Sequence, residues 1–99
     1  MKVTRVKPML TYGCKHYGVS VLTSYLKLTE VLGEPSIIEN IDYDVKSIQW
    51  SLLFGDSTII TVYSWNKHPD INENIEWYIG SKTLEESLDF IDDLHNHIS

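Results

Sequence analysis

The chain has 99 residues, the size of one domain, so we expect a single domain over residues 1–99. Its composition, 42% hydrophobic and 22% charged, is typical of a folded protein and excludes an intrinsically disordered chain. The formal net charge of −6 disfavours direct binding to nucleic acid, whose phosphates repel an acidic protein.

Cysteine usage and hydropathy favour a cytoplasmic protein. Cys14 is the only cysteine, so no intrachain disulfide can form, which fits a reducing compartment. No apolar run approaches the roughly 20 residues that span a bilayer, and residues 1–13 lack the apolar core of a secretory signal. We therefore expect a cytoplasmic location and no membrane contact.

Charge is divided unevenly along the chain. Residues 1–29 contain no acid, and all 14 Asp and Glu residues follow them; the early cations are Lys2, Arg5, Lys7, Lys15 and Lys27. This basic segment could hold a small phosphate-bearing ligand, or it could pair with the acidic remainder in the fold. The sequence leaves both interpretations open.

The first third of the chain predicts a short strand, a loop and a helix. Residues 2–10 alternate in character and predict a strand, which Pro8 ends or confines to a sheet edge because proline cannot donate a backbone hydrogen bond. Residues 12–18 predict a loop. In residues 19–32 apolar side chains recur at spacings of three and four, which predicts a helix ending at Gly33.

The middle of the chain predicts three consecutive strands. Residues 35–44 read as a connection, and residues 45–54 then alternate between apolar and polar side chains. A turn at 55–57 leads into 58–65, which is rich in β-branched and aromatic residues and apolar on both faces, so we expect a central strand. Residues 76–80 predict the third strand.

The last element is a predicted helix with a clear start. Thr83 followed by Glu86 matches a capping box, in which each side chain bonds the backbone N–H of the other residue. Apolar residues then recur at helical spacing to Ile98. We therefore expect an α+β fold: a three-stranded antiparallel meander, with residues 2–10 as an optional fourth strand, packed with two helices as a two-layer sandwich.

No catalytic motif is present in the sequence, so we do not expect an enzyme. Asp92 with His95, and Asp93 with His97, are spaced to meet on a helix face, but each pair lacks the third ligand that a metal site needs. We therefore expect no metal and no cofactor. Cys14 and His16 likewise lack a third group that would activate a nucleophile.

The segment between Gly13 and Gly18 has two interpretations. It carries Lys15 and His16 and precedes the predicted helix, whose free N–H groups would favour a phosphate. Its spacing matches no known phosphate loop, so a plain connecting loop is the alternative.

Aromatic residues end the strand predicted at 58–65. Tyr63 and Trp65 lie beside Lys67 and His68, and rings next to cations are how many proteins stack nucleobases. Rings at this position could equally close the rim of a small sheet. As ligand contacts we propose Lys15, His16, Tyr63, Trp65 and Lys67.

The last helix also carries a run of acids. Its carboxylates could imitate nucleic-acid phosphates and occupy a basic cleft on another protein, or they could form a solvated surface. The partner-binding candidates under the first interpretation are Glu85, Glu86, Asp89 and Asp93.

A motif, W-x3-F-x-D-x-T-x4-Y-x-W followed by E-W-x-I-G, runs through residues 50–81. This pattern resembles that of a group of small, mostly uncharacterised tailed-phage proteins. The matching residues are Asp56, Thr58, Tyr63, Trp65, Trp77, Ile79 and Gly80. The chain departs from the pattern at Ser64, Tyr78 and Ser81, where the family has Asp, His and Gly.

The resemblance implies phage origin and a place in the cytoplasm of an infected bacterial host. By analogy with small phage proteins that act by binding, we expect a non-enzymatic counter-defence protein that sequesters a small nucleotide-type immune signal. The alternative is an acidic protein inhibitor that mimics nucleic acid and blocks a host defence protein or nuclease complex. A homo-oligomer is the expected means of enclosing the ligand.

Overall fold

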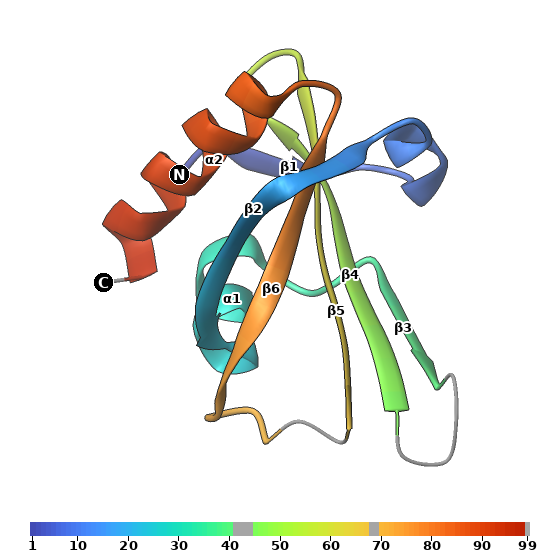
Figure 1. Ribbon diagram of the computed structural model, residues 1–99, viewed down its shortest axis with the longest axis vertical. Coiled ribbons are helices and arrows are strands. Elements are labelled where there is room, and N and C mark those ends of the chain that lie inside the picture. The colour runs from blue at the N-terminus through green and yellow to red at the C-terminus, as the bar shows by residue number, and fades with distance from the viewer. Residues whose placement is uncertain (41–44, 68–69, 99) are drawn as a thin grey trace.

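The computed structural model describes residues 1–40, 45–67 and 70–98, and describes only the backbone of Asn40, Val45, Lys46, Asn66 and Lys67. Within these residues an antiparallel sheet carries the helices α1 and α2 on one face (Figure 1). The elements in chain order are β1 (Val3–Arg5), the 3-10 helix η1 (Pro8–Thr11), β2 (Lys15–Ser24), α1 (Tyr25–Leu32), β3 (Ile37–Asn40), β4 (Val45–Phe54), β5 (Thr58–Lys67), β6 (Asn74–Ser81) and α2 (Leu84–Ile98).

The sheet confirms the α+β class but corrects the number of strands. Its six described strands run in the order β1-β4-β5-β6-β2, and β3 also pairs with β4. β1 pairs with the C-terminal half of β4, where Val3 is opposite Phe54. β3 pairs with the N-terminal half of β4, where Ile37 is opposite Gln49. The predicted meander is therefore only the centre of a wider sheet. β5 lies between β4 and β6, as expected of a central strand.

The helix predicted over residues 19–32 is half wrong. The structure has strand β2 to Ser24 and helix only from Tyr25 to Leu32. Val21 and Thr23 alternate with exposed positions and are buried, and their β-branched side chains favour a strand. The Ser24 hydroxyl then accepts the backbone N–H of Lys27 and caps α1.

Two further expectations need correction. The loop predicted at 12–18 gives way to strand from Lys15 onward, and the connection predicted at 35–44 contains β3. The short strand predicted at 2–10 is present as β1, and η1 begins at Pro8.

The capping box at the start of α2 is confirmed. The Glu86 carboxylate accepts the backbone N–H of Thr83 at 3.2 Å, and the Thr83 hydroxyl accepts the backbone N–H of Glu86 at 3.2 Å. Two donors that the helix itself leaves unpaired are thereby satisfied. No helix in the described ranges is long and apolar enough to cross a membrane.

Two tryptophans form the centre of the core between the sheet and the helices. Trp50 and Trp77 are fully buried, with ring centroids 5.3 Å apart and planes at 72°. Their indole N–H groups donate to the carbonyls of Gly33 (2.8 Å) and Thr23 (2.9 Å), so no buried donor is left unpaired on either ring. The other buried apolar residues are Val21, Leu28, Leu32, Ile48, Leu52, Ile60, Val62, Ile79, Phe90, Ile91 and Leu94.

Candidate ligand-binding site on the open face of the sheet

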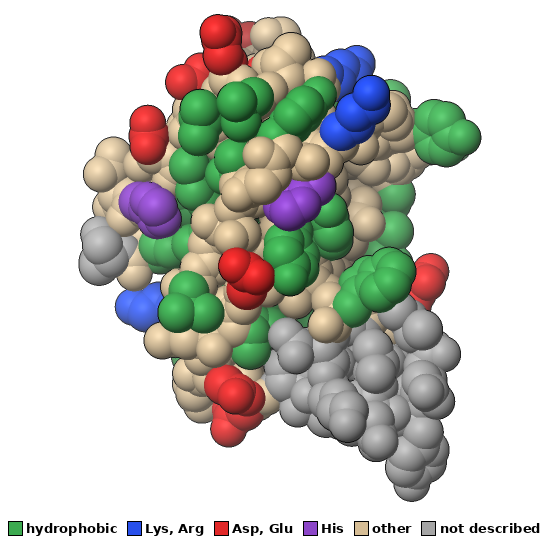
Figure 2. All heavy atoms as spheres, viewed as in Figure 1, with side chains coloured by type: hydrophobic (Ala, Val, Ile, Leu, Met, Phe, Trp, Pro, Cys, Tyr) green, Lys and Arg blue, Asp and Glu red, His purple; other side chains and the backbone are tan. Residues whose placement is uncertain are grey.

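Four aromatic side chains line one open hollow on the sheet face opposite the helices. The strand alternation that buries Val62 and Ile79 turns Tyr63 and Tyr78, which are paired in register, toward this open face. The hollow has a volume of ≈ 380 Å³ and is lined by His16, Tyr63, Trp65 and Tyr78. Figure 2 shows hydrophobic side chains gathered around a histidine near the centre of the view.

Three of these rings contact one another and form a floor. The His16 and Tyr78 ring centroids lie 5.1 Å apart with an interplanar angle of 76°, and Tyr63 lies 5.7 Å from Tyr78 at 41°. His16 and Tyr63 are 6.4 Å apart at 78°. Trp65 is 68% exposed, which leaves much of its indole surface open to a flat ligand.

A bulge in β2 places His16 in this group. His16 faces Gly80 and Ser20 faces Tyr78, so β2 has extra residues between two positions that are only two apart on β6. Gly18 lies in this irregular segment with φ +82°, a conformation that glycine adopts without strain. The Tyr17 hydroxyl donates to the Lys82 carbonyl at 2.7 Å and ties the bulged segment to the end of β6.

The surroundings of the Tyr63 and Tyr78 hydroxyls raise the pKa of both side chains. A hydrogen bond to the Glu76 carboxylate, and the charge of that carboxylate, raise the pKa of Tyr78 above its ordinary value. Glu76 also accepts the Ser20 hydroxyl at 2.9 Å. Burial raises the pKa of Tyr63. Both phenols are therefore neutral at physiological pH and can donate or accept hydrogen bonds.

The structure brings together some of the residues predicted from the sequence. His16, Tyr63 and Trp65 line the hollow, whereas the exposed Lys15 does not. The side chain of Lys67, and His68 entirely, lie outside the described residues. Tyr78 was missed, although its alternation with Trp77 put it on the face opposite the core. Pairing the predicted strands 58–65 and 76–80 and asking which side chains share the face of Tyr63 would have identified Tyr78.

The helix expected after the segment from Gly13 to Gly18 is not there. Because β2 continues to Ser24, this segment offers no helix N-terminus to an anion.

Cys14 is not a reactive thiolate. Burial raises the pKa of its thiol, which lies 3.8 Å from the Ile59 carbonyl and is therefore neutral.

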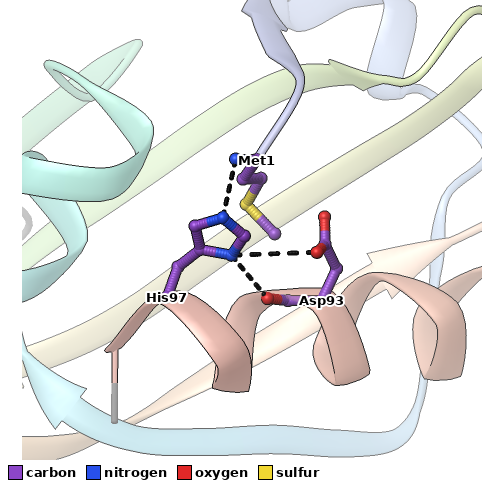
Figure 3. Close-up of polar contacts among 3 residues, drawn as sticks. All are labelled: Met1, Asp93 and His97. Carbon is purple, nitrogen blue, oxygen red and sulfur yellow. Dashed lines mark hydrogen bonds and ion pairs between the residues drawn. The ribbon is translucent and has the colours of Figure 1, made fainter.

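The acids of α2 differ in their contacts. The Glu86 carboxylate is engaged in the capping box, and Asp93 lies beside His97, whose Nδ1 is 2.9 Å from the Asp93 carbonyl and 3.7 Å from its carboxylate. Nε2 of the same histidine accepts a hydrogen bond from the amino group of Met1 at 2.8 Å (Figure 3). Of the four predicted partner contacts, Glu85 and Asp89 are exposed and carry no such bond to a described residue.

Across the described ranges, no group of three or more His, Cys, Asp or Glu side chains is placed to hold a metal ion. His97 instead joins the C-terminal turn of α2 to the start of the chain.

Comparison of the chain with protein-family models, curated proteins and solved structures finds no match. The resemblance to small tailed-phage proteins therefore depends on the motif residues alone and stays a prediction.

Proposed function

We propose that the chain is a non-enzymatic binding protein that takes up a small nucleotide-type ligand in the hollow on the open sheet face. The observation that supports this proposal is the convergence of His16, Tyr63, Trp65 and Tyr78 on one hollow. Aromatic rings on an open sheet face stack nucleobases, and each stacked base contributes about 1–3 kcal/mol. The largely apolar wall and the few polar groups are typical of a small-molecule site.

The two kinds of side chain have different roles in this proposal. The exposed indole of Trp65 stacks on the base, because it is the ring with the most free surface. The neutral phenols of Tyr63 and Tyr78 and the imidazole of His16 hydrogen-bond to the polar edges of the ligand. Lys15 and Lys67 remain proposed phosphate contacts. Lys15 directly precedes His16 in the chain, and Lys67 follows Trp65 by two positions.

The proposed biological role is sequestration of a nucleotide immune signal by a phage counter-defence protein. The resemblance to tailed-phage proteins supports the phage assignment, and an infected bacterial cytoplasm is the place that it implies. Sequestration requires binding without turnover, and the hollow offers stacking surface rather than an activated nucleophile.

Isothermal titration calorimetry against cyclic and linear nucleotides tests the proposal. We expect heat from at least one nucleotide and recovery of that ligand unchanged by chromatography. The Trp65→Ala variant should bind that nucleotide more weakly, and Leu26→Ala, which removes an exposed apolar side chain of α1 away from the hollow, should bind it as the wild type does. Absence of heat from every nucleotide would contradict the binding proposal, and a changed ligand would contradict the non-enzymatic assignment.

A further inference from the structure

Three large apolar side chains protrude together from η1 and the residue that follows it. Met9 is 73% exposed, Leu10 is 51% exposed and Tyr12 is 93% exposed. Single exposed apolar residues are ordinary on protein surfaces, but a group of them within four residues marks an interaction surface. We call Met9, Leu10 and Tyr12 the η1 knob.

The charge around the knob indicates the chemistry of its partner. Lys7 and Lys15 flank it in the chain, are exposed, and form no ion pair with any residue of the described ranges. By contrast, Lys2 is already paired with Asp56 at 3.1 Å. A surface that covers the knob should therefore be apolar in its centre and acidic around it.

A surface of that description lies on α2 of the same chain. Leu84 and Leu88 are one helical turn apart and remain 46% and 44% exposed. Three exposed acids border them on the helix, and in the described structure none of the three forms an ion pair or a side-chain hydrogen bond: Glu85, Asp89 and Asp92. We call these five residues the α2 stripe.

These two surfaces lie apart in one molecule. Figure 1 shows η1 at the upper right of the view, and it contacts β4 and β5; α2 lies at the upper left and packs against β2, β6 and β5. In Figure 2 acidic side chains border the upper left of the view, and Lys and Arg side chains lie at the upper right. The complementary surfaces therefore face in different directions and are available to different copies.

We propose that the η1 knob of one copy docks on the α2 stripe of a second copy. Met9 and Tyr12 then cover the exposed leucines, while Lys7 approaches the bordering carboxylates. The contact is head-to-tail, because it joins two different surfaces, and a dimer formed by it keeps one free knob and one free stripe. Assembly therefore continues beyond a dimer, either closing into a ring or extending as a chain.

Two complementary variants test this contact. The knob variant carries Lys7→Glu, Met9→Ser and Tyr12→Ser, and so retains an intact stripe. The stripe variant carries Leu88→Ser, Asp89→Lys and Asp92→Lys, and so retains an intact knob. All these side chains are exposed, so both variants should unfold at the wild-type temperature.

Analytical ultracentrifugation over a range of concentrations gives the readout. The mean mass of the wild type should rise with concentration above the monomer, and high salt should reverse the rise. Each variant alone should remain a monomer. An equimolar mixture of the two should form a particle of twice the monomer mass and nothing larger, because only one knob and one stripe remain to pair.

A matched control removes the same chemistry from α1 and the segment that follows it. Leu26→Ser, Glu30→Lys and Glu34→Lys change one exposed leucine and two exposed acids, and should assemble as the wild type does. A wild type that stays monomeric at millimolar concentration would overturn the proposal. So would a mixture of the two variants that contains monomers alone, or a control variant that fails to assemble.

Discussion

The rings of His16 and Tyr78 meet edge to face, with centroids 5.1 Å apart, although the regular ladder between their strands is interrupted at that point. His16 faces Gly80 and Ser20 faces Tyr78, so the bulge in β2 brings the imidazole over the neighbouring phenol. Gly18, with φ +82°, lies inside the bulge. The aromatic floor of the hollow therefore depends on a backbone conformation that most residues disfavour.

Substitution of Gly18 should separate these two rings. Gly18→Ala places a Cβ at a positive φ, which costs about 1–2 kcal/mol and favours a more regular strand. We expect a lower free energy of unfolding and altered NMR shifts of the His16 ring protons, which Tyr78 now influences.

Gly33→Ala is the matched control, because Gly33 also has a positive φ (+83°) but lies at the end of α1. This variant should lose similar stability without moving the His16 signals. Equal shifts of those signals in both variants would contradict the assigned role of the bulge.

Alanine substitution should reduce stability far more at Trp77 than at Trp65. Trp77→Ala removes a fully buried ring and its hydrogen bond to Thr23, and should cost about 3–5 kcal/mol of unfolding free energy. Trp65→Ala removes a ring that is 68% exposed and should change stability by no more than about 0.5 kcal/mol.

Ligand binding should show the reverse order. Loss of the Trp65 ring should weaken nucleotide binding by about 1–3 kcal/mol, measured by calorimetry. Severe destabilisation by Trp65→Ala in urea denaturation would instead show that this ring only completes the fold.

The elements that sequence patterns predicted correctly are those encoded by neighbouring residues. Gly55, with φ +66°, makes the turn between β4 and β5, and Thr83 with Glu86 starts α2. Each signal lies within a few residues and needs no distant partner. Alternation in β4 likewise placed Ile48, Trp50 and Leu52 on one face, and all three are buried.

β2 could not be predicted in the same way. Residues 19–24 fit both helical spacing and strand alternation, and pairing with β6, about fifty residues away, decides between them. The position of His16 beside Tyr78 has the same origin, because it depends on the bulge in β2 rather than on any local motif. Pairing between strands that are distant in the sequence thus determined the structure of residues 19–24, which local patterns left ambiguous.

Thr61 offers a substitution that should stabilise the protein. Its side chain is 7% exposed, and its hydroxyl is buried without a hydrogen-bond partner among the described residues. Thr61→Val keeps the shape and replaces this unpaired group with a methyl, so the free energy of unfolding should rise by about 1 kcal/mol. Ser81→Ala is the control, because the buried Ser81 hydroxyl donates to the Thr83 carbonyl at 2.6 Å and its loss should destabilise. A stability loss in both variants would mean that the Thr61 hydroxyl has a partner.

Alkaline pH should weaken the fold through its tyrosines. Burial raises the pKa of Tyr25 and of Tyr63 above the ordinary value of 10.0. Between pH 10.0 and the native pKa, the native state keeps protons that the unfolded chain has released. The contribution of these two tyrosines to the free energy of unfolding is therefore fully present below pH 10.0, and it is lost as pH rises through the native pKa. The free energy of unfolding should therefore fall above this pH. Tyr25→Phe with Tyr63→Phe should flatten the fall relative to Tyr12→Phe, and an unchanged slope would contradict this assignment.

The capping box should contribute to stability as a coupled pair. The Thr83 hydroxyl accepts the Glu86 N–H, and the Glu86 carboxylate accepts the N–H groups of Thr83 and Lys82, each at 3.2 Å. Thr83→Ala leaves an orphan donor in the first turn and should lower the unfolding free energy by about 0.5–2 kcal/mol.

A double-mutant cycle separates this pairing from the effect of helix charge. Glu86→Gln keeps a side-chain acceptor but removes the negative charge from the positive end of the α2 dipole, and should cost less than Glu86→Ala. Combining Thr83→Ala with Glu86→Ala should cost less than the two single effects together, because each change also disturbs the bonds of the other residue. Strict additivity in thermal or urea denaturation would mean that the two hydrogen bonds act independently, and that the box orders the start of α2 only through its separate caps.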